Sequence, residues 1–240
     1  MNYYSLISSM SKGVSYPPII TSGLILHYDI SNPSCYIGSG TIVNDLSASP
    51  NGAFLQNGVA YNSNYGGTLV FDGVDDFLQV NAQPALTNAC TIETWCNLDT
   101  VISNDKWLVG VEESYRILYN GTSFQFVVKT VNNGWYSAGT VITMTTINHI
   151  NTNCQIVASY NGSRLKFYIN GVLQTTSATN ISGNLFSMPS NPYVLIKDGS
   201  TSTGIDYGKG KVYQHRLYNT ALSDADILTN FNANKTKFGL

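Results

Sequence analysis

Three aspartates in one turn are the residues of this 240-residue sequence best suited to bind a metal ion. Asp72, Asp75 and Asp76 lie close together, and calcium takes about six to eight oxygen ligands from carboxylates and carbonyls. Asp29 and Asp206 would add ligands if the fold brings them near. The alternative is a plain hairpin turn in which the carboxylates are solvated or cap backbone N–H groups. The sequence therefore offers one candidate calcium site, with this structural alternative left open.

Aromatic side chains near turns form a second candidate site. Sugar-binding sites pair aromatic faces with amides, carboxylates and backbone groups, and the chain has 16 Tyr and 3 Trp. We expect a ligand platform from residues near predicted turns, namely Trp107, Tyr115, Asn132, Asn133, Trp135 and Tyr136. Aromatic residues of β-sandwiches are more often core residues than ligand contacts. We expect that core role for Trp95, packed between two sheets.

The histidines and cysteines suggest no further chemistry. His27, His149 and His215 are far apart in sequence and have no neighbouring nucleophile, which favours structural or exposed roles. Cys90 and Cys96 fall on one face of one predicted strand, roughly 20 Å apart, too far to form a disulfide. We therefore expect reduced cysteines that act as small core side chains, and no zinc site.

The elements that must position these residues are short strands. Between residues 24 and 218, β-branched and aromatic runs alternate with turns, six of which contain Asn-Gly, a strong hairpin signal. The predicted strands are 24–30, 53–59, 68–71, 77–80, 90–98, 107–111, 115–119, 123–131, 135–145, 154–160, 164–169, 172–175, 193–196 and 208–218. Many short strands are typical of an all-β sandwich.

The last strand is followed by one short helix. Alternation predicts that Val212, Gln214, Arg216 and Tyr218 share one face of the strand, and that Tyr213, His215 and Leu217 share the other. Ser223 is a good helix N-cap, and Asp226 three residues later completes a capping box. Ile227 and Phe231 lie one turn apart, which predicts a single apolar stripe.

Five segments in order resemble the concanavalin A-like sandwich, in its laminin-G-like subgroup. They are residues 23–29, 67–77, 90–95 and 156–171, and the closing strand and helix, and together they span 23–235. The resemblance implies a jelly roll of two antiparallel sheets, often with a calcium site and a ligand surface at a sheet edge or concave face. We expect one such domain over residues 23–240, preceded by an arm or linker at 1–22. The segment 221–238 is similar to the ends of such domains in virion proteins of tailed phages and large DNA viruses.

Related sandwiches include laminarinase-type glycoside hydrolases, which act through a pair of catalytic carboxylates. A retaining site needs two carboxyl groups roughly 5 Å apart, most simply at alternate positions of one strand. The corresponding strand offers Glu93, and Asp99 is six residues away, too far to pair with it. We expect no catalytic residue, and a structural hydrogen bond or a sheet-end cap for Glu93.

Composition limits the partners. Charged residues make up 11% of the chain and the net charge is -2, so there is no basic surface for nucleic acid or an anionic membrane. Residues 1–10 lack the positive and apolar regions of a secretory signal, and no apolar run is long enough to span a membrane. We therefore expect synthesis in a host cytoplasm without a signal peptide.

Three functions remain. The first is a noncatalytic structural or decoration protein of a virion surface, docked on other virion proteins and able to form a homo-oligomer on the particle. The second is a lectin-like module that binds host or environmental glycans, either with or without calcium. The third, disfavoured by the missing carboxylate pair, is a glycoside hydrolase.

Overall fold

A computed structural model of the chain describes residues 18–99, 106–119, 122–135, 137, 139, 141–145, 149–198 and 206–240. Most of the predicted arm, the Asn120-Gly121 turn and Tyr136 lie outside these residues. Within them, no helix is long and apolar enough to cross a membrane.

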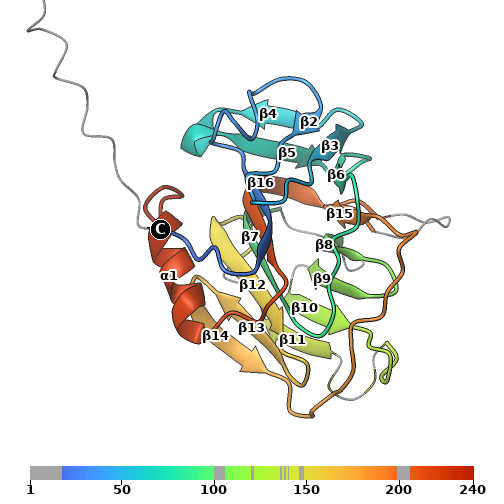
Figure 1. Ribbon diagram of the computed structural model, residues 1–240. Coiled ribbons are helices and arrows are strands. Elements are labelled where there is room, and N and C mark those ends of the chain that lie inside the picture. The colour runs from blue at the N-terminus through green and yellow to red at the C-terminus, as the bar shows by residue number, and fades with distance from the viewer. Residues whose placement is uncertain are drawn as a thin grey trace, which may run out of the picture.

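Two antiparallel sheets face each other in the described part of the chain (Figure 1). The first has the order β14 (Val172–Thr176), β13 (Leu165–Ile169), β12 (Cys154–Tyr160), β7 (Cys90–Leu98), β16 (Lys209–Tyr218), β5 (Thr68–Asp72) and β4 (Ala60–Asn62), and β1 (Leu24–Asp29) also pairs with β16. The second has the order β11 (Val141–Thr145), β10 (Ser123–Val128), β9 (Tyr115–Tyr119), β8 (Lys106–Val111), β15 (Tyr193–Leu195), β6 (Phe77–Val80), β3 (Ala53–Gln56) and β2 (Ile42–Val43). A 3-10 turn (Asn64–Gly66) and one helix, α1 (Asp224–Asn234), complete the fold, which confirms the predicted all-β class.

Strand β16 organises the first sheet. It pairs with β7 along one side, and on its other side its first half pairs with β5 and its second half with β1. A bulge between Val212 and Gln214 interrupts the pairing with β7. Because a bulge shifts the alternation, Val212 packs in the core between the sheets while Tyr213 packs on the outer face with Trp95. The predicted faces are therefore wrong at Val212 and Tyr213, although Arg216 and Leu217 lie on opposite faces as expected.

The core between the sheets is built from the inward-facing residues of both. Ile92 and Phe167 of the first sheet and Phe124 and Leu195 of the second belong to one buried cluster. The four cysteines are unbridged and buried in the same cluster, as expected for small core side chains. Burial raises the pKa of the Cys90 thiol to about 12, so this thiol remains protonated and unreactive near neutral pH.

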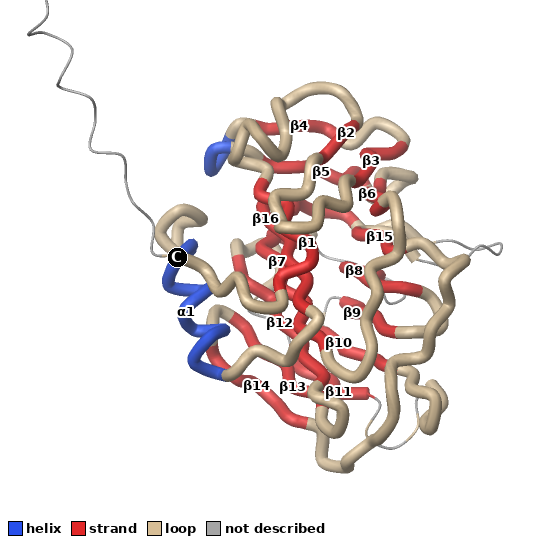
Figure 2. Tube along the Cα trace, in the orientation of Figure 1, coloured by secondary structure: helices blue, strands red, loops and turns tan. Residues whose placement is uncertain are grey.

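Helix α1 and the residues after it cover the outer face of the first sheet (Figure 2). The predicted capping box is confirmed, since the Ser223 hydroxyl accepts from the N–H of Asp226 and the Asp226 carboxylate accepts from the N–H of Ser223, both at 3.1 Å. Ring centroids of Phe231 and Phe238 lie 5.7 and 4.8 Å from Trp95. Trp95 is thus fully buried, but beneath the C-terminal segment and not between the sheets as predicted.

Several predicted strand boundaries are too generous. The predicted strand 135–145 shrinks to β11, and Trp135 lies in the preceding loop. Gly139 in that loop has φ +86°, and a Cβ there would lie 2.6 Å from the carbonyl oxygen of Thr179. This backbone conformation at Gly139 needs glycine, so an extended strand does not pass through residue 139.

Candidate functional site

A cation and two indole rings stack on the outer face of the second sheet. The guanidinium carbon of Arg116, on β9, lies 5.0 Å from the ring centroid of Trp107 and 4.5 Å from that of Trp135. Trp107 is 4% exposed and rests on Leu118 and Val127, whereas Trp135 forms the partly exposed outer layer. We call Trp107, Arg116 and Trp135 the tryptophan stack. Cation–π contacts hold such a stack in a fixed orientation.

Two glutamates of the β8–β9 turn fix the stack from the side. Glu112 Oε2 accepts from Arg116 Nη1 at 3.2 Å. Glu113 accepts from Trp135 Nε1 at 3.0 Å through Oε1 and from Lys129 Nζ through Oε2. Those two hydrogen bonds lower the pKa of Glu113, whereas burial raises the pKa of Glu112 despite Arg116 beside it. Glu113 also has φ +65°, a left-handed conformation that is unusual outside glycine and that concentrates at functional sites.

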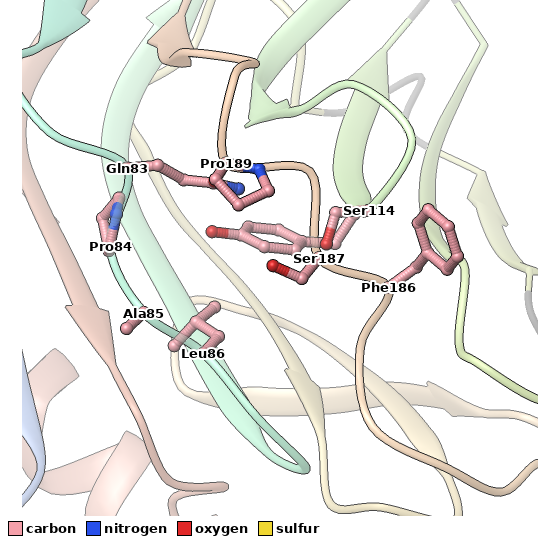
Figure 3. A pocket seen from close by; sticks show the side chains of 9 residues that line it. Gln83, Pro84, Ala85, Leu86, Ser114, Phe186, Ser187 and Pro189 are labelled. Carbon is pink, nitrogen blue, oxygen red and sulfur yellow. The ribbon is translucent and has the colours of Figure 1, made fainter.

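A pocket of about 250 Å³ adjoins the same turn (Figure 3). Residues 83–86 line one side, and Ser114 and Phe186 line the other. Tyr115 also lines the pocket, is 1% exposed, and its hydroxyl has no hydrogen-bond partner among the described residues. The Lys129 ammonium lies 4.2 Å from the Phe186 ring centroid. Lys129 also binds Glu113, which holds Trp135, so this lysine links the tryptophan stack to the pocket, which we call the turn pocket.

The structure brings together part of the predicted aromatic platform. Trp107 and Trp135 belong to one cluster, joined by Arg116. Tyr115 is not part of it, because adjacent residues of a strand point to opposite faces, and its ring packs in the core on Tyr193 at 6.1 Å. Its place in the turn pocket nevertheless keeps it at the site.

The two predicted asparagines shape a neighbouring loop. Asn133 Oδ1 accepts from the N–H of Ser182 at 3.1 Å, and Asn132 Nδ2 donates to the Ser182 hydroxyl at 3.2 Å. The N–H of Asn133 donates to Thr130 Oγ1 at 2.9 Å. These bonds fix the segment that leads to Trp135, so the asparagines support the stack, while Tyr136 lies outside the described residues.

Sequence reasoning missed the charged members of the site. Arg116, Glu112 and Glu113 fall within five positions of a chain in which only 11% of residues are charged. That local concentration, next to predicted turn residues, was the available signal. Lys129 gives no such signal, because only the pairing of β9 with β10 brings it to the turn.

The predicted calcium turn is compact. Carboxylate oxygens of Asp72, Asp75 and Asp76 lie within 4.8 Å of one another, and we call these residues the aspartate cluster. Asp76 is buried, and its Oδ2 accepts from the N–H of Asp72 at 3.1 Å. Burial and then the charges of Asp72 and Asp75 raise the pKa of Asp76, so these carboxylates repel one another.

The other two predicted ligands are placed elsewhere. Asp29 is paired with Lys237 at 2.8 Å, and Asp206 with Lys106 at 2.6 Å. Neither belongs to the aspartate cluster among the described residues. The lysines give each carboxylate a structural partner, and any metal site here depends on the three clustered aspartates and nearby carbonyls.

Glu93 is fully occupied by protein donors. Its Oε1 accepts from Trp95 Nε1 and Gln155 Nε2 at 2.9 Å and from Arg216 Nη1 at 2.7 Å. Its Oε2 accepts from Asn230 Nδ2 of helix α1 at 2.8 Å. With a side chain 1% exposed, Glu93 is closed to any substrate, which fits the predicted structural hydrogen bond.

Two facing antiparallel sheets with this strand order define the jelly-roll class of β-sandwich. Within that class, the chain belongs to the concanavalin A-like lectin/glucanases superfamily, whose family model matches residues 72–228. No sequence among the curated proteins matches the chain.

Solved structures of similar fold include binding domains of toxins. The receptor binding domain of botulinum neurotoxin C/D mosaic serotype superposes with a TM-score of 0.68 at 15% identity, covering 88% of this chain and 51% of that one. The binding domain of Paraclostridial Mosquitocidal Protein 1 gives 0.67 at 14% identity, with 88% and 52% covered. The serotype D ligand binding domain, solved in complex with N-acetylneuraminic acid, gives 0.65 at 15%, with 88% and 51% covered. The chain spans about half the length of these domains, and the likeness shows the fold alone.

Proposed function

We propose that this domain is a noncatalytic, lectin-like module that binds a carbohydrate at the surface around the β8–β9 turn. The observation that carries the proposal is the partly exposed Trp135 ring, held by Arg116 and Glu113 beside further charged groups. An aromatic face bordered by fixed hydrogen-bonding groups suits the apolar face and the hydroxyls of a sugar ring. Because these side chains are already ordered, little entropy is lost when a ligand binds.

The closed environment of Glu93 supports binding over hydrolysis. A glycosidase needs two accessible carboxyl groups, and this strand contributes one that is buried in a hydrogen-bond network. A neurotoxin ligand binding domain that shares this fold over about half of its length was solved in complex with N-acetylneuraminic acid. Fold similarity at this level of identity is analogy, so the proposal depends on the site.

A glycan array with the purified protein tests the proposal. We expect saturable binding to a defined set of glycans, and Trp135→Ala should weaken it about thirtyfold, as for an aromatic hot-spot residue. The control is Phe54→Ala, which removes an exposed aromatic ring from β3 of the same sheet and should bind like the unmodified protein. Absence of binding, or a Trp135→Ala variant that binds normally, would reject the proposal.

We also propose that the aspartate cluster binds calcium. The donor set fits, because three carboxylates within 4.8 Å, one of them buried, match the ligands of a hard cation. A bound cation would relieve the repulsion that raises the pKa of Asp76. The aspartates would hold the ion, which would supply positive charge to the turn and no catalytic step.

Where the protein acts is a separate proposal. The similarity of segment 221–238 to virion proteins supports a module displayed on a virion surface, docked on other virion proteins. Antibody labelling of purified particles tests this idea. A glycan-binding protein that is never associated with particles would leave the lectin proposal intact and reject the virion location.

A further inference from the structure

The turn pocket differs in chemistry from the tryptophan stack beside it. Its lining combines two prolines, a leucine and a phenylalanine with the polar side chains of Gln83, Ser114 and Ser187. None of the lining residues that the structure describes carries a charge. The neighbouring charges are matched, because Lys129 is bound by Glu113 and Arg116 by Glu112. A ligand that enters this pocket meets hydroxyls, an amide and apolar surface.

We propose that the turn pocket binds one neutral pyranose unit of the glycan and that Tyr115 is a ligand-binding residue there, an inference that rests on the proposed lectin function. The volume fits a single ring. Pockets for drug-sized ligands measure about 300–1,000 Å³, so about 250 Å³ accommodates a monosaccharide and excludes a longer chain. The remainder of the glycan would continue over the tryptophan stack.

Tyr115 supplies the observation that points to a ligand. Tyr115 is only 1% exposed, and its hydroxyl has no hydrogen-bond partner among the described residues. Nearly all buried polar groups in proteins are hydrogen-bonded, so such a hydroxyl needs an explanation. Burial raises the pKa of Tyr115 well above its usual range, which keeps the hydroxyl protonated and able to donate. A sugar hydroxyl is a suitable acceptor for it.

The backbone joins the pocket rigidly to the stack. The carbonyl of Ser114 accepts from the N–H of Lys129 at 2.7 Å, and the carbonyl of Lys129 accepts from the N–H of Phe186 at 2.9 Å. Ser114 and Phe186 both line the pocket, and Lys129 binds the Glu113 that fixes Trp135. These bonds fix the turn pocket and the tryptophan stack relative to each other, so that one glycan can contact both.

The pocket also predicts selectivity. A sugar carboxylate placed there would lose its hydration without meeting a lysine or arginine among the described lining residues. The module should therefore favour neutral hexoses over N-acetylneuraminic acid, the ligand of the structurally similar serotype D domain.

The test is Tyr115→Phe, measured by calorimetry with methyl glycosides of galactose, glucose, N-acetylglucosamine and N-acetylneuraminic acid. We expect affinity for a neutral glycoside to fall about tenfold while the melting temperature stays equal or rises, because removal of an unpartnered buried hydroxyl does not destabilise the free protein. Tyr119→Phe is the matched control. Its hydroxyl donates to the carbonyl of Lys209 at 3.1 Å, so this variant should lose stability and keep affinity. Ser187→Leu, at an exposed lining position, tests the pocket independently by filling it.

The outcomes separate this inference from the lectin proposal. Normal monosaccharide binding by both Tyr115→Phe and Ser187→Leu, with binding lost in Trp135→Ala, would overturn the pocket and keep the lectin. Preference for N-acetylneuraminic acid would overturn the neutral selectivity. Absence of glycan binding by the unmodified protein would overturn both proposals.

Discussion

Two glutamates of this chain show how environment decides the role of one residue type. Glu93 is 1% exposed and bound by four side-chain donors, whereas Glu113 is partly exposed in a turn and bound by Lys129 and Trp135. The first joins helix α1 to the sheet, and the second positions a surface aromatic ring. Only the second has a geometry that can meet a ligand.

We predict that Glu93→Gln destabilises the protein by about 3–5 kcal/mol, since it leaves the Arg216 charge buried without its partner. Urea unfolding measures the change. Glu113→Gln, at a partly exposed ion pair, should cost about 1 kcal/mol or less. Equal costs for the two variants would contradict the structural role of Glu93.

Because His215 is buried, we predict that the free energy of unfolding falls in acid. Burial and the charge of Arg216 lower its pKa from 6.5 to about 3, and its ring nitrogens form hydrogen bonds with Thr94 and Tyr193 at 2.9 and 2.8 Å. Between these two pKa values the unfolded chain binds a proton that the folded state excludes. The stabilisation is complete above pH 6.5 and is lost as the pH falls toward 3. Burial likewise lowers the pKa of His27, to about 4, which acts in the same direction.

The free energy of unfolding between pH 7 and 4.5 measures this loss. His215→Gln, which cannot take up the proton, should be less stable at pH 7 but show a flatter pH dependence. Parallel pH profiles for the two proteins would exclude His215 as the source.

At the scale of helices and strands, the sequence predicts the features that depend on residues close together in the chain. The capping box at Ser223 and the bounds of β7 follow from side-chain preference and alternation, and both match the structure. The bulge in β16 and the burial of Trp95 beneath α1 do not follow, because they depend on distant segments that pack on the sheet. Likewise, residues Trp107 and Trp135 were recognisable as candidates, but their meeting across Arg116 required the sheet register.

Helix α1 and the following turn cover Trp95 on the outer face of the first sheet, and Phe238 should hold this covering segment in place. Phe238 is fully buried against Trp95 and Tyr213, so Phe238→Ala should cost about 3–5 kcal/mol. Urea unfolding measures the cost, and tryptophan emission should shift to longer wavelength as Trp95 becomes hydrated. Leu240→Ala, at a 43% exposed position, is the control. A small cost with unchanged emission would mean that the tail is not part of the core.

At the scale of the whole molecule, the two proposed sites lie at opposite ends of the second sheet. Leu78 pairs with Leu195, and Leu195 with Val109, so the β6 end that follows Asp76 lies near the start of β8. The β8–β9 turn lies at the other end of β8, beyond Val111. The four residues of strand β6 separate its two ends by about 10 Å.

We therefore predict that calcium stabilises the domain without changing its affinity for glycans. Thermal unfolding should shift upward with millimolar calcium, and Asp76→Asn should abolish the shift. In chelator, this variant should be at least as stable as the unmodified protein, since it removes a repelled charge. Glycan affinity that disappears in chelator would contradict the separation of the two sites.

The position of β16 has a consequence for how the chain folds. Its partners β1, β5 and β7 begin at residues 24, 68 and 90, yet the strand that joins them begins at residue 209. During synthesis, the edges of β1, β5 and β7 that pair with β16 stay unpaired until β16 leaves the ribosome. Pairings this distant in sequence make folding slow and leave partly folded chains open to aggregation. A ribosome-bound chain that stops short of residue 209 is thus a natural client for a chaperone.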